Sequence, residues 1–594
     1  MASSMCGICA EIALDGSDAH LGSVEKMLHE LSPRGPDASG AFRQGRLAVG
    51  HRRLKVIDLT EKASQPMLDP ELGLGISFNG CIYNYKELRK ELEAKSYSFF
   101  SSGDTEVILK AYHAWGDDCV KHFNGMFAFI IWERDSGRIF MARDRLGIKP
   151  LYYAEVDGKL RIASSLPALV KSGGISTEID SEALNFYMSF HSVVPAPWTI
   201  LKSVRKLPPA SRMIIEPAGE IKINSYWQLN FETVSKVASR KFEDWKIEIA
   251  MALKESMKRR MMADVAVGVL LSGGLDSSLI VGLLDAMGQR NLHTFSIGFE
   301  SEGGEKGDEF EYSDVIAKHF KTDHHRIFIN SKEVIENLQK CIEAMSEPMV
   351  SHDVIGFYLL SREVKKHIKV VQSGQGADEV FAGYHWYPPL LETKNLVDDY
   401  SRVFLDRDFP EYKKAITSPY IGEDYSQEFI REHFVQKGAD LAINKALRLD
   451  TTVMLVDDPV KRVDNMTMAW GLEARVPFLD HELVELAAQV PVKWKVGNGG
   501  KYILKEVARQ FIPDSVIDRP KGYFPVPALK FLKGSYLERV KDVLTSKAAT
   551  NRALFNHDYI NGILKNPDEH ITPLRGSKLW QMALLEEWFQ VHKL

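Results

Sequence analysis

The sequence predicts a two-domain α/β protein, in which a layered domain of short strands precedes a domain built on a doubly wound parallel sheet. Short strand-like segments separated by turns fill the first 210 residues, whereas longer helical segments alternate with buried strand-like ones from Trp245 onward. Two glycine-rich loops, at residues 272–278 and 373–378, directly follow strand-like segments, at the end where doubly wound sheets bind ligands. A chain of 594 residues is also too long for one hydrophobic core.

Alternating apolar residues predict the strands of the first domain at residues 47–59, 75–82, 126–132 and 138–143, the last two forming a hairpin. Helical periodicity predicts covering helices at residues 21–31, 85–95 and 105–115. A strand-like tail at residues 221–229 leads into a polar segment at 230–242. We therefore expect a first domain at residues 6–212, a linker at 213–243 and a second domain at 244–594.

The second domain is predicted to begin with a helix that ends near Met262. Strands are expected at residues 265–271, 292–299 and 368–372, and a helix at 277–287. From Tyr400 to the end the pattern is mainly helical. This alternation indicates a parallel doubly wound sheet followed by a helical region.

The composition is typical of a soluble globular protein, with 45% hydrophobic and 26% charged residues. A formal net charge of -5 provides no extended basic surface, so nucleic acid is not expected as a partner. No stretch approaches the roughly 18 apolar residues of a membrane helix, and no secretory signal pattern is present. Five sparse cysteines favour the reducing cytoplasm. The oligomeric state stays open, with a homodimer as one expectation.

The loop at residues 272–278 has the features of a phosphate site. Gly273 and Gly274 allow a tight turn and close approach of a ligand, while Ser277 and Ser278 begin a helix whose free N–H groups attract anions. The loop has no lysine, so it departs from the pattern G-x-x-x-x-G-K-[ST]. It resembles the pyrophosphatase-type loop of ATP-dependent adenylating enzymes, which implies that AMP is placed on a carboxylate. The alternative is a glycine-rich turn without a ligand.

Two carboxylates accompany these loops. Asp276 lies in the first loop and Asp378 ends the second, so the predicted fold would bring them face to face. Mg²⁺ favours carboxylates combined with phosphate oxygens, and both residues are therefore proposed as magnesium ligands. The alternative for Asp378 is a solvated helix start.

Cys6 is a candidate nucleophile. If it were the first residue of the mature chain, its own α-amino group, with a pKa of about 8, would serve as the base for its thiol. Two alternatives remain at this point. Cys6 and Cys9 match a redox or metal half-site, although the chain has no second pair to complete a zinc site, or Cys6 is simply buried and inert.

Several motifs carry a family resemblance. They are residues 34–37 (RGPD), 50–54 (GHRRL), 79–84 (NGCIYN), 103–106 (GDTE) and 143–152 (RDRLGIKPLY). They resemble the glutaminase domain of N-terminal-nucleophile amidotransferases, which implies an α/β/β/α sandwich. Together with the later loop, they resemble the glutamine-hydrolysing asparagine synthetase family over nearly the whole chain. This resemblance implies glutamine and a carboxylate acceptor as substrates, ATP and Mg²⁺ as cofactors, and an internal passage for ammonia.

The resemblance also implies roles for single residues. Cys6 would attack the glutamine amide, Asn79 and Gly80 would stabilise the oxyanion, and Arg53 and Asp104 would hold the α-carboxylate and α-ammonium. The pocket would also be lined by Leu54, Ile57 and Cys81. The nucleotide would contact Leu271, Ser272, Gly273, Gly274, Asp276, Ser277, Ile297, Ser373 and Gly374. Lys521 would meet phosphate and developing charge. Taken singly, Arg53 could be a surface ion pair, Asp104 a helix cap and Asn79-Gly80 a turn.

Two features of the first domain depart from the family. Cys81 stands where the family commonly has glutamate, so one contact to the glutamine α-ammonium is missing or replaced. Residues 1–5 precede Cys6, and while they are attached Cys6 has no free amine. We therefore expect that translation starts at Met5, that the leader is removed, or that it is not part of the native protein.

The second domain departs at Gln375, where asparagine synthetases typically have a glutamate associated with aspartyl-adenylate formation and attack by ammonia. A neutral amide cannot act as a base, which places asparagine formation in doubt. With Cys81 and the aromatic run at residues 384–389, Gln375 resembles the N-acetylglutaminylglutamine amidotransferase branch, which amidates a dipeptide made as an osmoprotectant. The alternative for the aromatic run is core packing.

The preferred acceptor is accordingly a small acylated dipeptide, and aspartate is the alternative. Residues 459–480 match a helical family motif, whose Arg462, Asp464, Glu473 and Arg475 we interpret as structural ion pairs. Two other functions compete with the amidotransferase. The protein could be a plain glutaminase with a regulatory nucleotide-binding module, or a non-catalytic scaffold with both sites degraded.

Overall fold

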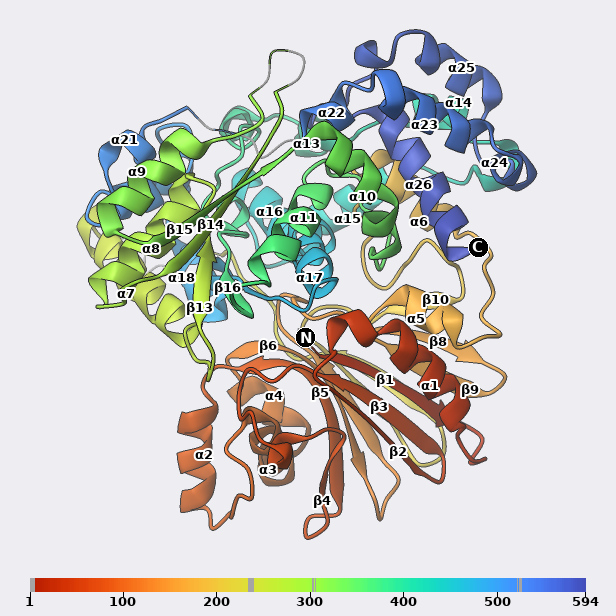
Figure 1. Cartoon of the computed structure of the whole chain (residues 1–594), viewed down its shortest axis with the longest axis vertical. Helices are drawn as coiled ribbons and strands as arrows, with labels where there is room; N and C mark the ends of the chain where they lie inside the picture. Colours follow the sequence, from red (N-terminus) through yellow and green to blue (C-terminus); the bar gives the residue numbers. More distant parts are fainter. Residues whose placement is uncertain (1–5, 233–239, 302–303, 305, 521, 523–525) are drawn as a thin grey trace.

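The computed structural model describes residues 6–594 except 233–239, 302–303, 305, 521 and 523–525. The chain forms two halves that pack against each other, the first coloured red to orange in Figure 1 and the second green to blue. In the described part of the chain, none of the helices combines the length and apolar character needed to cross a membrane.

The first half contains two six-stranded antiparallel sheets. The first sheet has the order β10 (Val204–Lys206), β8 (Tyr152–Val156), β9 (Lys159–Ala163), β1 (Gly7–Ala13), β3 (Leu47–Arg53) and β2 (Ala38–Gln44). The second has the order β12 (Ile221–Ser225), β11 (Ser211–Ile215), β7 (Ile139–Arg143), β6 (Gly125–Glu133), β5 (Leu74–Ile82) and β4 (Met67–Asp69). The predicted hairpin of β6 and β7 is confirmed.

The alternation of side chains along the strands builds four layers. On β6, Ala128, Ile130 and Trp132 enter the core between the two sheets. The intervening Phe127 and Phe129 face the other way and pack with α3 (Asp104–Trp115), which lies beside α2 (Tyr85–Ala94). The first sheet is covered by α1 (Leu21–Glu30) and α5 (Leu166–Lys171). The predicted α/β/β/α sandwich is therefore confirmed.

The strands β11 and β12 fall mostly within the segment expected to be a linker. They pair with β7 and with each other, and so belong to the second sheet of the first half. Regular structure among the described residues then stops at Ser225 and resumes at α7 (Phe242–Arg259). The predicted strand at residues 221–229 is shorter than expected, because its later residues leave the sheet.

The second half is built on a five-stranded parallel sheet with the order β15 (Asp323–Ile329), β14 (His293–Phe299), β13 (Val267–Leu270), β16 (Val370–Gln372) and β17 (Glu473–Arg475). The sheet carries α8 (Leu275–Ala286), α9 (Phe310–Phe320), α11 (Val354–Val364) and α17 (Lys461–Met468). The chain leaves β13 towards β14 and returns to the other side of β13 as β16. This reversal is the switch point at which doubly wound sheets bind ligands.

Helices dominate the rest of the second half, as predicted. They include α10 (Ser331–Glu343), α13 (Leu396–Phe404), α15 (Tyr425–Val435), α16 (Ala442–Leu449), α18 (His481–Gln489), α20 (Tyr502–Ala508), α23 (Gly534–Thr545) and α26 (Lys578–His592). Between α16 and α17 the chain runs as two π-helical turns, η6 (Asp450–Met454) and η7 (Val456–Val460). Such turns are rare and frequently lie at functional sites.

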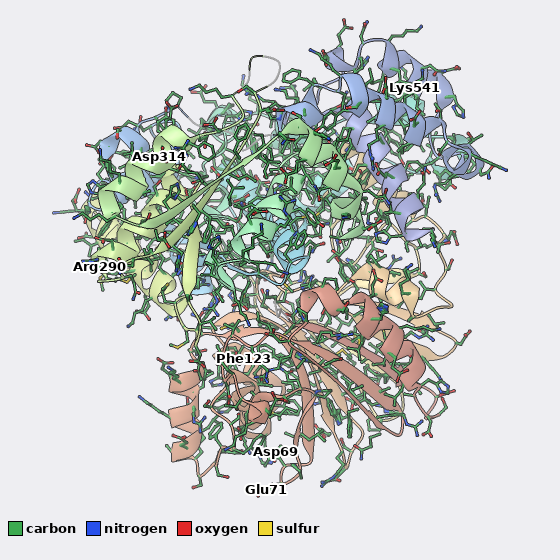
Figure 2. All side chains as sticks on the ribbon, in the orientation of Figure 1. Asp69, Glu71, Phe123, Arg290, Asp314 and Lys541 are labelled. Atoms are coloured by element: carbon green, nitrogen blue, oxygen red, sulfur yellow. The ribbon has the colours of Figure 1, made fainter. Side chains whose placement is uncertain are left out.

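Charged side chains such as those of Arg290, Asp314 and Lys541 extend from the surface in Figure 2, whereas Phe123 is fully buried. Polar groups are buried mainly where they are paired, as Asp69 is with Lys110. This distribution is that of an ordinary globular protein.

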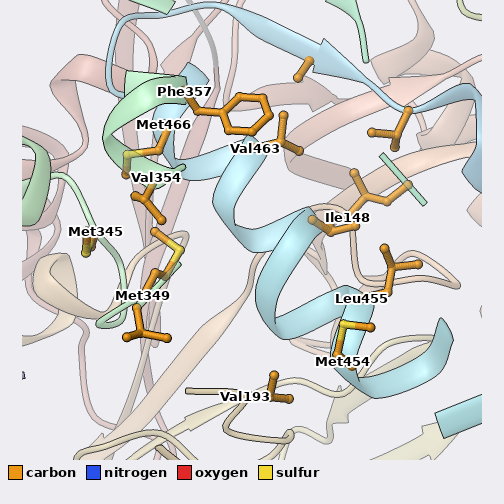
Figure 3. Close-up of a cluster of buried hydrophobic side chains, with 14 of the residues drawn as sticks. Ile148, Val193, Met345, Met349, Val354, Phe357, Met454, Leu455, Val463 and Met466 are labelled. Carbon is orange, nitrogen blue, oxygen red and sulfur yellow. The ribbon is translucent and has the colours of Figure 1, made fainter. Parts of the chain in front are cut away.

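The two halves meet through an apolar cluster and a buried group of charges. In Figure 3, Ile148 and Val193 of the first half pack near Met345, Met454 and other residues of the second. Close by, Lys206 Nζ lies 3.1 Å from Glu347 Oε2 and 2.5 Å from Asp457 Oδ1, and Lys461 Nζ lies 3.3 Å from Glu347 Oε2.

Candidate active sites

One pocket in the first half collects the residues predicted to bind glutamine. It is lined by Cys6, Arg53, Leu54, Ile57, Asn79, Gly80, Cys81 and Asp104. They come from the start of β1, the end of β3 and the loop after it, the strand β5, and the first residue of α3. Segments up to a hundred residues apart in the sequence thus converge around the Cys6 thiol.

Cys6 is half-buried, and its thiol is a weaker acid than an ordinary cysteine thiol. The Leu54 N–H donates to Cys6 Sγ at 3.4 Å. Burial raises the pKa of the thiol to about 12, and the nearby Glu473 carboxylate acts in the same direction, while the Leu54 hydrogen bond and Arg53 lower it. The neutral thiol therefore predominates near pH 7, and nucleophilic attack requires a base close to the sulfur.

Asn79 and Gly80 lie within β5, so the interpretation of this pair as a simple turn is wrong. Asn79 is fully buried, and neither its amide oxygen nor its amide nitrogen has a hydrogen-bond partner among the described residues. Gly80 has φ of 150°, and a Cβ there would lie 2.0 Å from the Met126 carbonyl oxygen. A buried amide without a partner, held on a rigid strand, is suited to donate a hydrogen bond to negative charge that develops only during a reaction.

Arg53 and Asp104 are held by backbone groups. The Arg53 guanidinium donates to the Thr60 carbonyl at 2.8 Å and to the Asp58 carbonyl, and among the described residues no carboxylate forms an ion pair with it. It is 3% exposed, so it is not a surface residue. Asp104 accepts the Ile82 N–H at 3.0 Å, and burial raises the pKa of its carboxyl to about 6. It begins α3 and also lines the pocket.

Two residues of the second half complete the wall of this pocket. Glu473 and Arg475 lie on β17, so the prediction that they belong to a helix is wrong. Arg475 Nε donates to Glu473 Oε1 at 2.5 Å, and Arg475 Nη2 lies 3.9 Å from Cys81 Sγ. An ion pair from the other half therefore lies next to Cys81. Glu473 and Arg475 are two residues apart within an apolar run. This spacing is typical of a strand that presents both charges on one face.

The remaining residues of that motif form ion pairs, as predicted. Asp464 lies 3.0 Å from Arg34 Nη2 and 3.1 Å from Lys149 Nζ, both of the first half. Arg462 pairs with Asp353 and Asp458 at 3.2 and 2.8 Å.

The two glycine-rich loops meet at the switch point of the parallel sheet. The first follows β13, and α8 begins at Leu275 with Gly274 at its N-cap. Gly273 has φ of 78°, and a Cβ there would lie 2.6 Å from the Ser313 nitrogen, so only glycine fits. A Cβ at Gly374 in the second loop would lie 3.0 Å from the Asp276 Cβ. Ser272 and Ser277 hydrogen-bond within the first loop, and Ile297 lies on the neighbouring β14.

A buried lysine joins the two predicted magnesium ligands. Lys501 Nζ lies 2.6 Å from Asp276 Oδ2 and 2.9 Å from Asp378 Oδ1. Burial lowers the pKa of Lys501, but the two carboxylates outweigh it and raise the pKa above its usual range. The two carboxylates therefore converge on one cation, which is the arrangement that a bridging divalent ion needs. Lys501 was not predicted as a site residue, because it lies 225 residues from Asp276 in the sequence and no local pattern points to this contact.

Two further residues were singled out at the second site, Gln375 and Lys521. Gln375 is half-buried in the second loop. Lys521 lies outside the described residues, and the role proposed for it stays a prediction.

A large cavity adjoins the nucleotide loops. Its volume is about 550 Å³, and its wall includes His191 of the first half together with Tyr312, Tyr384, Trp386 and Arg462. Tyr312 also packs on Gly273, which places the cavity next to the first loop. The π-helical turns supply Met454, Asp458 and Pro459.

The aromatic run contributes to both the wall and the core. Tyr384 stacks on Trp386 with ring centroids 4.1 Å apart, and Trp386 Nε1 donates to Asp450 at 3.2 Å. The Tyr384 hydroxyl donates to Glu379 Oε1 at 2.6 Å. Burial, helped by the adjacent Asp378, raises the pKa of Glu379 to about 8.

Two family models match the chain in the order that the two sites occupy. The glutamine amidotransferase domain matches residues 5–227, and asparagine synthase matches residues 248–590. The chain belongs to the glutamine-hydrolysing asparagine synthetase family. It is therefore an enzyme, a glutamine amidotransferase that forms carbon–nitrogen bonds, as the motifs predicted.

Curated relatives align with most of the chain. Asparagine synthetase 1 of Bacillus subtilis is 32% identical over 96% of this chain and 93% of its own length. Asparagine synthetase B of Escherichia coli is 28% identical over 83% of this chain and 76% of its own. The amidase chyE of Penicillium rubens is 26% identical over 91% of this chain and 92% of its own.

Proposed function

We propose that this enzyme hydrolyses glutamine at Cys6 and uses the ammonia to amidate a carboxylate that ATP activates at the second site, with a small acylated dipeptide as the preferred acceptor. The observation that carries the proposal is the convergence of the two loops, Asp276 and Asp378 beside a cavity of about 550 Å³. The relatives named asparagine synthetases support aspartate as the second candidate acceptor.

At the first site, the Cys6 sulfur attacks the amide carbon of glutamine and passes its proton to a base. The raised pKa of the thiol makes this base necessary, and the α-amino group of a chain that begins at Cys6 would supply it. The orphaned Asn79 amide and the Gly80 N–H receive the oxyanion, while Arg53 and Asp104 bind the α-carboxylate and α-ammonium. Ammonia leaves, and water hydrolyses the thioester. Sequencing active protein tests this role, because its first residue should be Cys6.

The pair of Glu473 and Arg475 links this site to the second one. Glu473 faces the pocket beside Asp104, where it supplies a second carboxylate for the substrate ammonium in the absence of an acid at position 81. Because β17 is part of the parallel sheet, a shift of the sheet would change the glutamine pocket directly.

At the second site, the backbone of the first loop and the N-terminus of α8 bind the phosphates of ATP. Asp276 and Asp378 would hold Mg²⁺, which would neutralise phosphate charge when bound. Lys501 lies between the same carboxylates and is the cation that balances them in this structure. The acceptor carboxylate attacks the α-phosphorus, releasing pyrophosphate and leaving an acyl-adenylate.

The size and lining of the cavity favour an acceptor larger than aspartate. Its volume lies within the range of about 300–1,000 Å³ that is typical for ligands of drug size. The stacked Tyr384 and Trp386 offer an apolar face for such an acceptor. Ammonia loses a proton as it displaces AMP, and the Tyr384–Glu379 pair, with a carboxyl pKa of about 8, is placed to accept it where Gln375 cannot.

Ammonia must reach the second site as the neutral molecule. The cluster in Figure 3 begins with Met454 in the cavity wall and extends to Ile148 of the first half. We propose that ammonia passes along this cluster. Apolar side chains favour NH₃ over NH₄⁺ there, because burial of an unpaired ion is costly.

The test is pyrophosphate and AMP release with ATP, magnesium and glutamine in the presence of N-acetylglutaminylglutamine or of aspartate. We expect release to depend on the dipeptide. Cys6→Ala supplied with ammonium chloride isolates the second site and should keep the same acceptor preference. Asparagine formation without dipeptide turnover would replace our acceptor with aspartate. Glutamine hydrolysis without any acceptor-dependent AMP release would indicate a plain glutaminase.

A further inference from the structure

Three side chains of types that commonly bind metals meet at the amino-terminal ends of two strands of the parallel sheet, away from both sites described above. His293 begins β14 and Asp323 begins β15, and the register of the two strands places these residues opposite each other. His325 lies two residues beyond Asp323, on the same face of β15. One ligand atom from each of the three lies within 4.8 Å of the others.

The separations suit a tetrahedral ion. His293 Nδ1 lies 2.9 Å from Asp323 Oδ2, and His325 Nε2 lies 3.5 Å from the same oxygen. Zinc bonds of about 2.0–2.1 Å at tetrahedral angles place neighbouring ligand atoms about 3.3 Å apart. Small side-chain rotations would therefore bring all three atoms to the required distance.

The two imidazole nitrogens also lack the partners that buried nitrogens normally have. His293 Nδ1 and His325 Nε2 are both shielded from solvent, and neither makes a hydrogen bond among the described residues. Both approach the Asp323 carboxylate without the angle of a hydrogen bond. Buried polar atoms of this kind call for an explanation, and an absent ion is a standard one.

The ring of His325 is held in place by its neighbours. It stacks on Phe295 with centroids 4.8 Å apart and on His367 with centroids 4.2 Å apart. A ligand whose orientation is fixed by packing loses little freedom when it binds an ion. His367 also brings a third imidazole beside the cluster.

We propose that His293, Asp323 and His325 form a binding site for a divalent transition-metal ion, with Zn²⁺ as the best fit. Two imidazoles and one carboxylate match zinc, whereas Mg²⁺ and Ca²⁺ prefer oxygen ligands alone. A fourth position is left for water or another donor. Ile297, at the nucleotide end of β14, lies four residues from His293, or about 13 Å along the strand. The ion therefore fastens β14 to β15 and takes no part in amide formation.

The experiment is a zinc titration of the full-length protein against a competing chromophoric chelator. The parent is Cys6→Ala, which removes the reactive thiol as a zinc ligand, and excess Mg²⁺ occupies Asp276 and Asp378. We expect one tight equivalent in the parent and a zinc-dependent rise in Tm. His293→Ala and His325→Ala should each weaken binding at least a hundredfold and abolish the rise. The matched control His319→Ala, an exposed histidine on α9, should behave as the parent does.

Asp323→Asn keeps the shape of the carboxylate and guards against a trivial loss of fold. Its Tm in chelator should equal that of the parent, while its zinc affinity falls. Substitution of Co²⁺ should give the visible absorption of a tetrahedral site in the parent and not in His325→Ala. Zinc binding of equal stoichiometry and affinity in all variants, or no zinc bound by the parent, would overturn the proposal.

Discussion

Replacing Asn79 by alanine should lower the glutaminase activity while leaving the stability of the protein unchanged or raising it. The Asn79 amide has two buried polar atoms without hydrogen-bond partners in the described structure. Each such atom costs about 1–3 kcal/mol of stability, and truncation removes both. The space left behind opens into the existing pocket, so the loss of packing offsets only part of this gain. We expect Asn79→Ala to be neutral or to stabilise the protein by about 1–2 kcal/mol, whereas loss of one oxyanion donor lowers kcat by about 10²–10³.

The matched control is Gln65→Ala in the same pocket. Gln65 Oε1 accepts the Phe78 N–H at 2.7 Å, and Gln65 Nε2 donates to Thr105 at 3.3 Å, so this amide is satisfied. Its removal leaves the Phe78 N–H without a partner and should destabilise the protein by about 1–3 kcal/mol.

Both variants are compared by steady-state glutaminase assays and by thermal unfolding, where 1 kcal/mol shifts Tm by about 2–4 °C for a domain of 150–250 residues. Asn79→Ala should retain or raise Tm and lose glutamate production. Unfolding of Asn79→Ala at as low a temperature as Gln65→Ala, or a kcat within tenfold of the wild type, would contradict this prediction.

Three further predictions concern charged residues. The pKa of Asp104 is about 6 and its carboxylate form is proposed to bind the ammonium, so kcat/KM for glutamine should fall below pH 6 by about a further tenfold per pH unit, beyond the fall caused by protonation of the α-amino base. Asp104→Asn should lack only this additional fall; a wild-type profile that does not steepen between pH 6 and pH 5 would contradict this. Glu473→Gln should raise KM for glutamine about 10- to 100-fold with kcat nearly unchanged, since a hydrogen bond to a charged group contributes about 1.5–3 kcal/mol; an unchanged KM would exclude Glu473 from binding. Lys501→Ala should abolish acceptor-dependent pyrophosphate release, because Asp276 and Asp378 lose their shared cation, while glutaminase activity persists; loss of both activities would indicate damage to the fold instead.

Much of the fold could be predicted because its physical causes are local. The strands β5, β6 and β7 carry apolar side chains on both of their faces, which are both buried, and the periodicity of α1 and α2 matches the single face that each helix buries. The first nucleotide loop was recognisable because the close approach at Gly273 admits no other residue.

The features that could not be predicted depend on contacts between segments that are distant in the sequence. The strand β15 is an edge strand with mostly exposed or half-buried residues, so it lacks the apolar run of a central strand. The strand β17 has only three residues and exists because β16 pairs with it. The place of Lys501 beside Asp276, 225 residues earlier, follows from tertiary folding alone. Local patterns carry no signal for such meetings.

The buried charges between the two halves determine how the molecule comes apart. Lys206 belongs to the first half, and its partners Glu347 and Asp457 to the second, all 2–5% exposed. Separating the halves would strand Lys206 on one side and leave its two carboxylates with only Lys461 on the other, and breaking a buried pair costs about 3–5 kcal/mol. If the gene is divided near residue 230, each fragment should therefore be unstable when expressed alone, because its former interface carries unpaired charges. Co-expression of the two fragments should restore a stable protein. Heating the intact chain should melt both halves in one cooperative transition.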